Sequence, residues 1–318
     1  MRIAITGAGG FIGRALIDHA IFIGFEVVAI TRGSNFNLLE SNSCFSTHRI
    51  DYLDISKLVE ILCGCDAVIH LAGRAHCFSD FSNPLILNSF DAANLTPLIS
   101  IAEASKIAGV SRVVFISSIG VNGPATYGIP FSETSLPNPA EYYSISKFKA
   151  ELRLAEILDG SSTDWSILRP PLVYGPNCPG NFNRLIKFLI KAPMVPFGSV
   201  NSFRSFIGID NLVDAVLLAS VDASISRRVL LLSDQDDLTL SSVIRILLEG
   251  LGQSWKLHSV PNWLLQFAMK TLRRQDIWNK FSSELLINSS LFSTLAGWRP
   301  VVSAKECLLK TSRSFLSN

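Results

Sequence analysis

Tyr143 and Lys147 stand four residues apart, and their types and spacing suit proton transfer. On a helix, residues four apart share a face, whereas the neighbouring Tyr142 would share its face with Ser146. A phenol with an ordinary pKa of about 10 is a poor acid or base at neutral pH, and a nearby ammonium favours its phenolate form. We therefore expect Tyr143 to carry general acid–base chemistry beside Lys147.

Two serines stand at the carboxyl end of the strand-like run at 112–118, and either one can complete this arrangement. A hydroxyl of Ser117 or Ser118 would hold the reacting oxygen of a substrate against the tyrosine. Each feature alone has an ordinary structural explanation, a surface Tyr–Lys pair or serines that cap a turn. Their order after a glycine-rich turn makes the combination specific.

That turn is "TGAGGFIG", which places Gly7, Gly10 and Gly13 between a strand and a helix. One glycine lets the chain reverse, a second lets backbone amides approach a pyrophosphate, and a third lets helix and strand pack closely. The helix N-terminus then faces the phosphates with partial positive charge. The pattern predicts dinucleotide binding, and an oxidised nicotinamide would also favour the phenolate of Tyr143; a tight turn without a ligand is the alternative.

The next strand ends in Thr31 and Arg32, where NAD-binding proteins carry an acidic residue for the ribose hydroxyl. An arginine can form paired hydrogen bonds with a 2′-phosphate, so NADP(H) is favoured and NAD(H) is possible. A solvated surface cation is the alternative. Asp51, after the third expected strand, would accept a hydrogen bond from the adenine amino group or simply cap a loop.

The elements that must position these residues alternate along the first half of the chain. Short β-branched runs alternate with segments whose apolar residues recur at three- and four-residue steps, which is typical of βαβ units. We expect an α/β fold, a Rossmann-type doubly wound parallel sheet with a smaller C-terminal substrate lobe. The expected strands are 2–6, 26–31, 47–51, 66–72, 112–118 and 164–170, and the expected helices are 11–24, a segment after Ser56, 85–109 and 140–158.

Proline and glycine clusters begin after Arg169 and mark a change of organisation. We expect residues 1–169 to form the dinucleotide-binding domain, with part of 206–232 returning to it. Residues 170–318 would form mainly a substrate-binding lobe.

Composition narrows the function classes. The 318 residues are 48% hydrophobic with a mean hydropathy of +0.34, yet no run reaches the roughly 18 to 20 apolar residues of a membrane span. The start "MRIAIT" does not resemble a signal peptide, so we expect a cytoplasmic protein. The net charge is only +2, and no dense block of lysine and arginine is interleaved with aromatic residues, so we do not expect nucleic-acid binding. Six scattered cysteines predict reduced thiols and no metal site.

The chain resembles the extended short-chain dehydrogenase/reductases, the NAD-dependent epimerase/dehydratase family. The similar segments are "TGAGGFIG", "HLAG", Asn94, "SSIGVNG", "YSISK", "RPPLVYGP", "RSFIGIDNLVDAV" and "LAGWRP", which together span nearly the whole chain. The resemblance implies catalytic Ser118, Tyr143 and Lys147, with Ser118 rather than Ser117 because it lies five residues before Gly123. The cofactor-binding residues that it implies are Gly7, Gly10, Phe11, Ile12, Gly13, Arg32, Asp51, Tyr52, Leu71, Ala72, Tyr143 and Lys147.

Within the family, the motifs look most like bacterial surface-polysaccharide enzymes that act at C4 of a UDP-linked N-acetylated sugar. Asn181 and Phe182 would approach the nucleotide base or the sugar. Arg204 would bind the diphosphate, or pair with a structural carboxylate such as Asp210. The substrate-binding residues expected overall are Arg74, His76, Ser118, Asn181, Phe182 and Arg204, and Cys178 in the same loop is expected to be an unreactive thiol.

Related dehydratases place an Asp–Glu pair directly after the serine or threonine, and here those positions are Ile119 and Gly120. Dehydration is therefore disfavoured. We expect a UDP-4-keto-6-deoxy-N-acetylhexosamine 4-reductase, with a UDP-hexose or UDP-N-acetylhexose 4-epimerase as the alternative. A non-catalytic NADP(H)-sensing module and a reductase of small ketones are disfavoured by the intact "YSISK" and by Arg204 respectively.

We also expect a homodimer. The resemblance implies a four-helix contact built from the two long helices, at about 84–108 and 140–158. These helices carry apolar side chains beyond what one sheet face needs, at Leu95, Leu98, Leu154 and Ile157.

Overall fold

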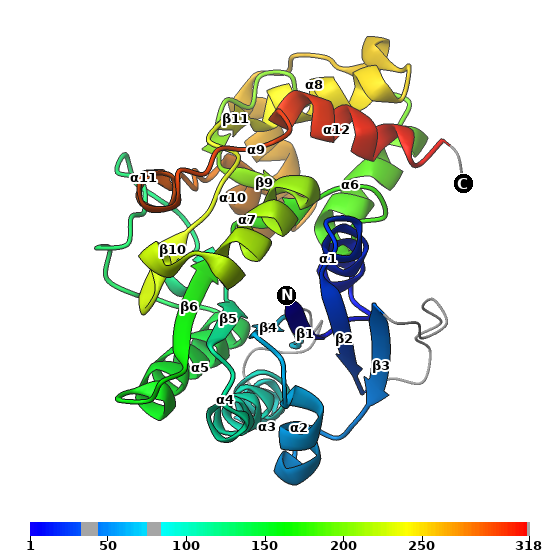
Figure 1. Ribbon diagram of the computed structural model, residues 1–318. Coiled ribbons are helices and arrows are strands. Elements are labelled where there is room, and N and C mark those ends of the chain that lie inside the picture. The colour runs from blue at the N-terminus through cyan, green and yellow to red at the C-terminus, as the bar shows by residue number, and fades with distance from the viewer. Residues whose placement is uncertain (33–43, 75–83, 317–318) are drawn as a thin grey trace.

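A computed structural model describes residues 1–32, 44–74 and 84–316. Its centre is a seven-stranded, wholly parallel sheet with the strand order β10-β6-β5-β4-β1-β2-β3 (Figure 1). This order confirms the expected doubly wound Rossmann-type sheet. The strands are β1 (Arg2–Thr6), β2 (Glu26–Thr31), β3 (Phe45–Arg49), β4 (Ala67–His70), β5 (Arg112–Ile116), β6 (Asp164–Arg169) and β10 (Arg228–Leu231).

The central strands are buried on both faces, which explains their continuous apolar runs. All five residues of β5 and all four of β4 are buried. The third strand begins two residues before its expected start, because Phe45 is buried and pairs with Val27 of β2. The sequence therefore predicts each of these strands to within a few residues.

Helices cover both faces of the sheet (Figure 1). One face packs against α1 and α7 around Leu16, Ile17 and Leu212, and the other packs against α2, α4 and α5 around Leu58, Leu98 and Leu154. The long helix expected at 85–109 is present but contains a π-helical turn. The bounds are α1 (Phe11–Phe22), α2 (Ile55–Leu62), α3 (Pro84–Phe90), the π turn η1 (Asp91–Leu95), α4 (Thr96–Ala108), the 3₁₀ turn η2 (Ile119–Val121), α5 (Tyr142–Leu158) and α7 (Ile209–Val221).

The apolar side chains expected at a dimer contact lie instead in the core of this chain. Leu98 and Leu154 are fully buried, and Leu95 and Ile157 pack partly buried against the same cluster. The sequence argument is wrong about these residues because one sheet face accommodates all of them.

The chain after β6 builds a second lobe over the end of the sheet, and also returns β10 to the sheet beside β6 (Figure 1). Its core contains Phe182, Ile186, Leu247 and Trp278. The remaining elements are β7 (Leu172–Tyr174), α6 (Gly180–Lys191), β8 (Phe203–Arg204), β9 (Phe206–Gly208), η3 (Ala223–Ile225), β11 (Leu238–Thr239), α8 (Leu240–Gly250), η4 (Ser254–Lys256), α9 (Asn262–Thr271), α10 (Gln275–Ser282), α11 (Ser290–Ala296) and α12 (Ala304–Arg313).

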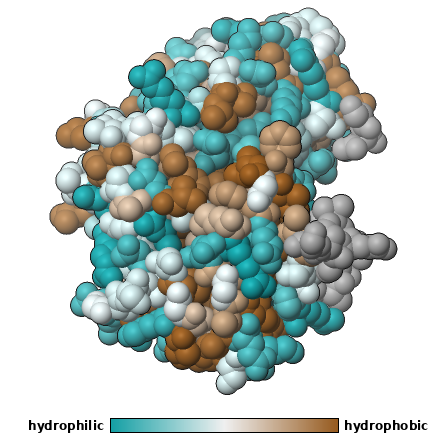
Figure 2. Space-filling view, viewed as in Figure 1, coloured by the Kyte–Doolittle hydropathy of each residue, from teal (hydrophilic) through white to brown (hydrophobic). Residues whose placement is uncertain are grey.

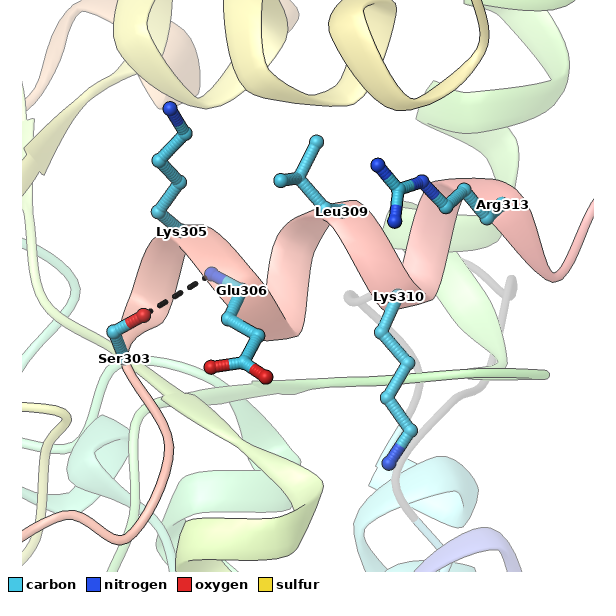
Figure 3. A pocket seen from close by; sticks show the side chains of 6 residues that line it. All are labelled: Ser303, Lys305, Glu306, Leu309, Lys310 and Arg313. Atoms are coloured by element: carbon cyan, nitrogen blue, oxygen red, sulfur yellow. Dashed lines mark hydrogen bonds between the residues drawn. The ribbon is translucent and has the colours of Figure 1, made fainter.

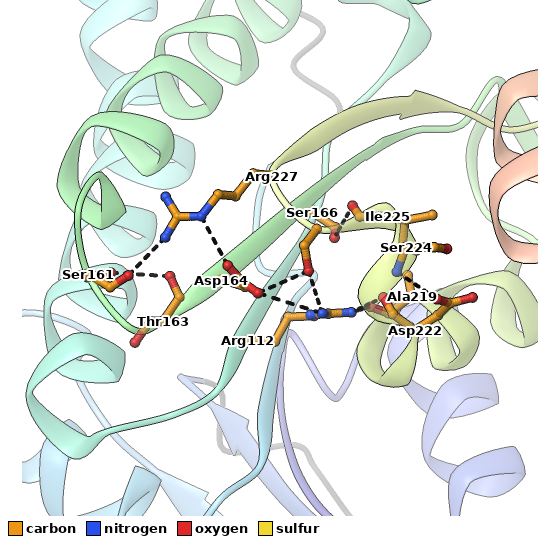
Figure 4. A network of polar contacts seen from close by, with 11 residues as sticks. Arg112, Ser161, Thr163, Asp164, Ser166, Ala219, Asp222, Ser224, Ile225 and Arg227 are labelled. Atoms are coloured by element: carbon orange, nitrogen blue, oxygen red, sulfur yellow. Dashed lines mark hydrogen bonds and ion pairs between the residues drawn. The ribbon is translucent and has the colours of Figure 1, made fainter.

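A buried arginine ties together the amino ends of the strands, away from the glycine turn (Figure 4). Arg112, at the start of β5, donates to the backbone carbonyls of Ala219 and Asp222 near the end of α7 and to Ser226 Oγ. Asp164, at the start of β6, accepts hydrogen bonds from Ser226 and Arg227. The network therefore fixes α7 and the β10 connection against the sheet.

Apolar residues also occur on the surface, where polar residues divide them into patches on the face shown in Figure 2. Over the described parts of the chain, no helix combines the length and the apolar character that a membrane crossing requires.

Candidate active site

The glycine turn joins β1 to α1 and has no room for side chains. Gly7 has a φ of +70°, and a Cβ there would lie 2.7 Å from the backbone nitrogen of Ala72. A Cβ at Gly13 would lie 2.4 Å from the carbonyl oxygen of Gly7, which accepts a hydrogen bond from Gly10 N at 2.9 Å. Helix α1 therefore starts at a tight turn without side chains, whose backbone amides a pyrophosphate could approach.

Arg32 directly follows strand β2 and is exposed to solvent. The guanidinium carbon lies 5.5 Å from the centre of the Tyr52 ring. Tyr52 is buried and bonds to the Gly7 backbone and the Thr6 side chain, and burial raises the pKa of its phenol. Tyr52 thus contacts both the glycine turn and the Arg32 side chain. Asp51 is exposed, and its Oδ1 accepts a hydrogen bond from Leu53 N at 3.2 Å, so it caps a loop as the alternative interpretation held.

Leu71 and Ala72 continue β4 toward the glycine turn. Ala72 N donates to Thr6 Oγ1 at 3.4 Å, and the same hydroxyl lies 2.9 Å from His70 Nδ1. Burial lowers the pKa of His70 to about 3, so this ring stays neutral. Thr6 and His70 therefore hold the ends of β1 and β4 together, a role that no sequence motif indicated.

Tyr143 is the second residue of α5 and faces the end of β5. Burial raises the pKa of its phenol to about 12, and the nearby Ser118 side chain opposes this shift. Ser118 begins the turn η2, and its Oγ accepts a hydrogen bond from Gly120 N at 3.2 Å. The structure therefore brings a protonated phenol and a positioned hydroxyl together.

The other serine of the pair points elsewhere. Ser117 is buried and donates to the carboxylate of Glu151. That carboxylate also accepts two hydrogen bonds from Arg169, at 2.9 and 2.5 Å, and Arg169 donates to Asn122 Oδ1 at 2.9 Å. Ser117 thus belongs to a buried ionic cluster beneath the site.

Lys147 lies one turn after Tyr143 and is buried. Its Nζ donates to the carbonyl oxygen of Ile116 at 2.9 Å and lies 4.5 Å from the centre of the Phe115 ring. Burial lowers the pKa of the ammonium to about 8, and the charge of Glu151 opposes this shift. The expected lowering of the Tyr143 pKa is wrong for the protein alone, because burial outweighs the other effects on the phenol.

The π turn η1 directs Asn94 toward the start of α5. Asn94 Oδ1 accepts from Arg74 N at 2.6 Å, and Nδ2 donates to Ser146 Oγ at 2.8 Å. Ser146 in turn donates to the carbonyl oxygen of Tyr143 at 2.7 Å. Asn94 therefore connects the segment after β4 to the helix that carries Tyr143. The sequence indicated this residue only as part of a motif.

Residues expected at the substrate are distributed unevenly. The side chains of Arg74 and Asn181 are exposed, and His76 lies outside the described residues. Phe182 is buried in the second lobe with its ring stacked 5.4 Å from that of Tyr174. Its side chain thus packs the lobe core, which corrects the expectation that it faces the sugar nucleotide.

Arg204 lies on β8 in the second lobe and is partly buried. It donates to the backbone carbonyl and to the hydroxyl of Ser283, at 3.3 and 3.4 Å. Desolvation lowers the pKa of its guanidinium. Asp210 instead binds Lys310 at 2.7 Å, so the pairing of Arg204 with Asp210 is wrong.

The two positions after Ser118 cannot supply a second acid and base. Ile119 is a buried apolar side chain. A Cβ at Gly120 would lie 2.4 Å from Ser144 Oγ, so no larger residue fits there without a shift. The arrangement can transfer one proton, between the Tyr143 hydroxyl and a substrate oxygen.

A surface pocket of about 420 Å³ lies along α12, where Lys305, Glu306 and Lys310 contribute to its walls (Figure 3). None of the site residues that the sequence predicts, among those the structure describes, lines this pocket. Cys178 is buried with a raised pKa, as expected for an unreactive thiol.

Comparisons with known proteins identify the family of this chain. The family model "NAD dependent epimerase/dehydratase family" matches residues 3–229. The chain is 30% identical to a UDP-glucose 4-epimerase of Vibrio cholerae over 99% of this chain and 95% of that protein. It is 25% identical to a 2-alkyl-3-oxoalkanoate reductase of Shewanella oneidensis over 98% of this chain and 85% of that protein. A solved UDP-glucuronic acid 4-epimerase from Bacillus cereus in complex with NAD has the same fold, with a TM-score of 0.80, 24% identity, and coverage of 100% of this chain and 99% of that chain.

Proposed function

The chain belongs to the NAD-dependent epimerase/dehydratase family, and we propose that it is a NADPH-consuming 4-reductase of a UDP-4-keto-6-deoxy-N-acetylhexosamine. At the coarser level, it is an enzyme of nicotinamide-dependent chemistry on nucleotide sugars. The observation that carries the choice of reductase is Arg32, a cation exposed beside Tyr52 at the strand end where an NAD-binding acid is usual.

The residues present fit a dinucleotide. Side chains at Gly7 and Gly13 would collide with the backbone of Ala72 and Gly7, so the glycines maintain the close turn that a pyrophosphate-binding loop needs. Arg32 is exposed among the described residues, and its guanidinium would form paired hydrogen bonds with a 2′-phosphate. A Cβ at Gly73 would lie 2.9 Å from Asn94 Oδ1 and 3.3 Å from Lys147 Nζ, so a side chain there would crowd the ammonium that would bind a ribose hydroxyl.

The catalytic residues act on the oxygen at C4. Ser118 donates a hydrogen bond to the keto oxygen and holds it against Tyr143. A bound reduced nicotinamide supplies the hydride that C4 gains. Tyr143 gives its proton to the oxygen, which yields a secondary alcohol. The raised pKa of about 12 keeps this phenol protonated at neutral pH, which is the form that a reductase requires.

The second lobe supplies the contacts for the UDP moiety. Arg204 is a partly buried, poorly solvated cation that also bonds to Ser283, and a diphosphate is a fitting counter-charge for such a guanidinium. Asn181 is exposed at the start of α6, where it can bond to the base or the sugar.

A UDP-sugar 4-epimerase is the second candidate, because the Vibrio cholerae relative carries that name and matches almost the whole chain. The same Ser118, Tyr143 and Lys147 would serve both reactions. In the epimerase, Tyr143 would first remove the proton from the C4 hydroxyl and later return it after the sugar has rotated.

Two assays separate the candidates. The purified protein is offered the UDP-4-keto sugar with NADPH, and absorbance is followed; the reductase consumes one cofactor for each alcohol formed. It is then offered UDP-glucose, UDP-galactose and their N-acetyl forms without added cofactor. Interconversion of these sugars, together with no NADPH oxidation on the keto substrate, would establish the epimerase and exclude the reductase.

We also propose a homodimer formed through α4 and α5. On these helices Ile107 and Leu152 are exposed, by 67% and 56%, and such side chains would be covered by a second copy. The mass in solution, measured by light scattering, tests this assembly.

A further inference from the structure

Helix α9 has apolar side chains on two faces, and only one of these faces packs against the rest of the chain. Leu265 is buried and Met269 is partly buried against the core of the second lobe. Trp263, Leu264 and Phe267 are exposed by 70%, 41% and 66%. Most surface helices are apolar on the core side alone, so the second apolar face needs an explanation.

The exposed side chains form one continuous surface. With about 100° of rotation per residue, Trp263, Leu264 and Phe267 fall within an arc of roughly 100°, and Leu265 and Met269 lie on the other side. Leu272, directly after the helix, is 68% exposed. Contiguous exposed apolar side chains of this kind mark a contact with another molecule or with a membrane.

The positive charge of this segment indicates which kind of partner α9 would contact. Residues 250–275 contain no aspartate or glutamate. Lys270, Arg273 and Arg274 are exposed at the end of the helix. A short helix that presents tryptophan, phenylalanine and leucine on one face, with cations beside them, complements the headgroup region of an anionic bilayer.

We propose that α9 docks this protein on an anionic lipid surface, with the helix parallel to the membrane plane. A second copy of the chain fits this surface less well, because symmetric contact of two α9 helices would oppose like charges at Lys270, Arg273 and Arg274. Ten residues of helix measure about 15 Å, so the helix lies on the bilayer and does not cross it.

Helix α9 is connected through α10 to Arg204, the candidate contact for the diphosphate. Helix α10 packs on α9 (Figure 1), and Ser283, which follows α10, accepts the hydrogen bond of Arg204. Docking would therefore bring the substrate lobe to the membrane surface. The docking proposal does not depend on the reaction at C4.

Sedimentation with lipid vesicles tests the proposal. The full chain is mixed with vesicles of phosphatidylcholine alone or of phosphatidylcholine with phosphatidylglycerol, and we expect it to sediment with the second kind. The double variant Trp263→Ser/Phe267→Ser should lose at least about tenfold in vesicle affinity. Phe22→Ser is the matched control, because Phe22 is 84% exposed on another helix, and it should bind like the wild type.

Charge is tested separately. Arg273→Gln/Arg274→Gln should remove the preference for phosphatidylglycerol, whereas Lys57→Gln/Arg299→Gln, which changes two exposed cations elsewhere, should keep it. Melting temperature and NADPH binding confirm that each variant is folded.

Three results would overturn the proposal. The first is a wild type that stays in the supernatant with both vesicles, and the second is equal binding by wild type and Trp263→Ser/Phe267→Ser. The third is a mass in solution that falls from dimer to monomer in that variant, which would show that two copies meet at α9.

Discussion

Glu151 and Arg169 form a bidentate ion pair, at 2.9 and 2.5 Å, with both side chains almost fully buried. The pair joins the catalytic helix to the end of β6. Glu151 also accepts the hydrogen bond of Ser117, so the strand end that carries Ser118 is held at the same point.

We predict that Glu151→Ala lowers the free energy of unfolding by roughly 3–5 kcal/mol, because it leaves the buried charge of Arg169 unpaired. Urea denaturation measures the change. Glu156→Ala on the same helix is the control, since Glu156 pairs with Arg153 at the surface and its loss should cost about 0–1 kcal/mol. Similar losses in both variants would mean that the buried pair contributes little.

Tyr143→Phe should reduce kcat by about 10²-fold or more, because it removes the proton donor and leaves the ring in place. The affinity for NADPH should change little, as measured by titration of protein fluorescence. Tyr142→Phe should retain near wild-type turnover. If Tyr142→Phe is the inactive variant, the assignment of the proton donor is wrong.

Arg32→Ala should weaken the binding of NADPH by roughly tenfold to a hundredfold. The binding of NADH should weaken much less, since only NADPH carries the 2′-phosphate. Binding constants for the two cofactors measure the difference. Arg153→Ala removes an exposed arginine of α5 and should affect neither cofactor. Equal weakening of NADPH and NADH by Arg32→Ala would show that Arg32 does not select the cofactor.

The pH dependence of reduction should have an alkaline limb near pH 8. Burial lowers the pKa of Lys147 to about 8, so the ammonium that would bind the ribose is lost above that pH, and kcat/KM should fall. Lys149→Met, which removes a more exposed lysine of the same helix, should leave the limb in place. A profile that stays flat to pH 10 would exclude this role for the Lys147 ammonium.

The same group has the opposite effect on stability. Between pH 8 and the ordinary lysine pKa of 10.5, the unfolded chain holds a proton that the folded protein has released. The contribution of Lys147 to the free energy of unfolding therefore rises with pH across this window. Lys147→Met should remove that rise in urea denaturation measured at several pH values.

Leu152→Arg should turn a dimer into a monomer, because it places a charge on the exposed part of α5 where a second copy would pack. Light scattering at micromolar concentration measures the mass. A wild-type mass of one chain would exclude the homodimer.

Short segments of the sequence are enough to predict the sheet, the glycine turn and the spacing of Tyr143 and Lys147. These features are local: the alternation of apolar residues, the absence of side chains at Gly7 and Gly13, and the four-residue step of a helix are all present in short segments. The strands and helices of the first half consequently lie close to where the pattern predicts them.

How these residues meet depends on contacts between segments that are distant in the sequence. Ser117 and Ser118 are adjacent in the chain, and the direction of each follows from what packs against the strand end, Glu151 for one and Tyr143 for the other. Phe182 is in the lobe core because Tyr174 offers its ring a partner. The pKa of Tyr143 depends on burial, and the two apolar faces of α9 can be assigned to core and surface only when the second lobe is in place. Burial is a property of the folded chain, since it depends on residues distant in sequence.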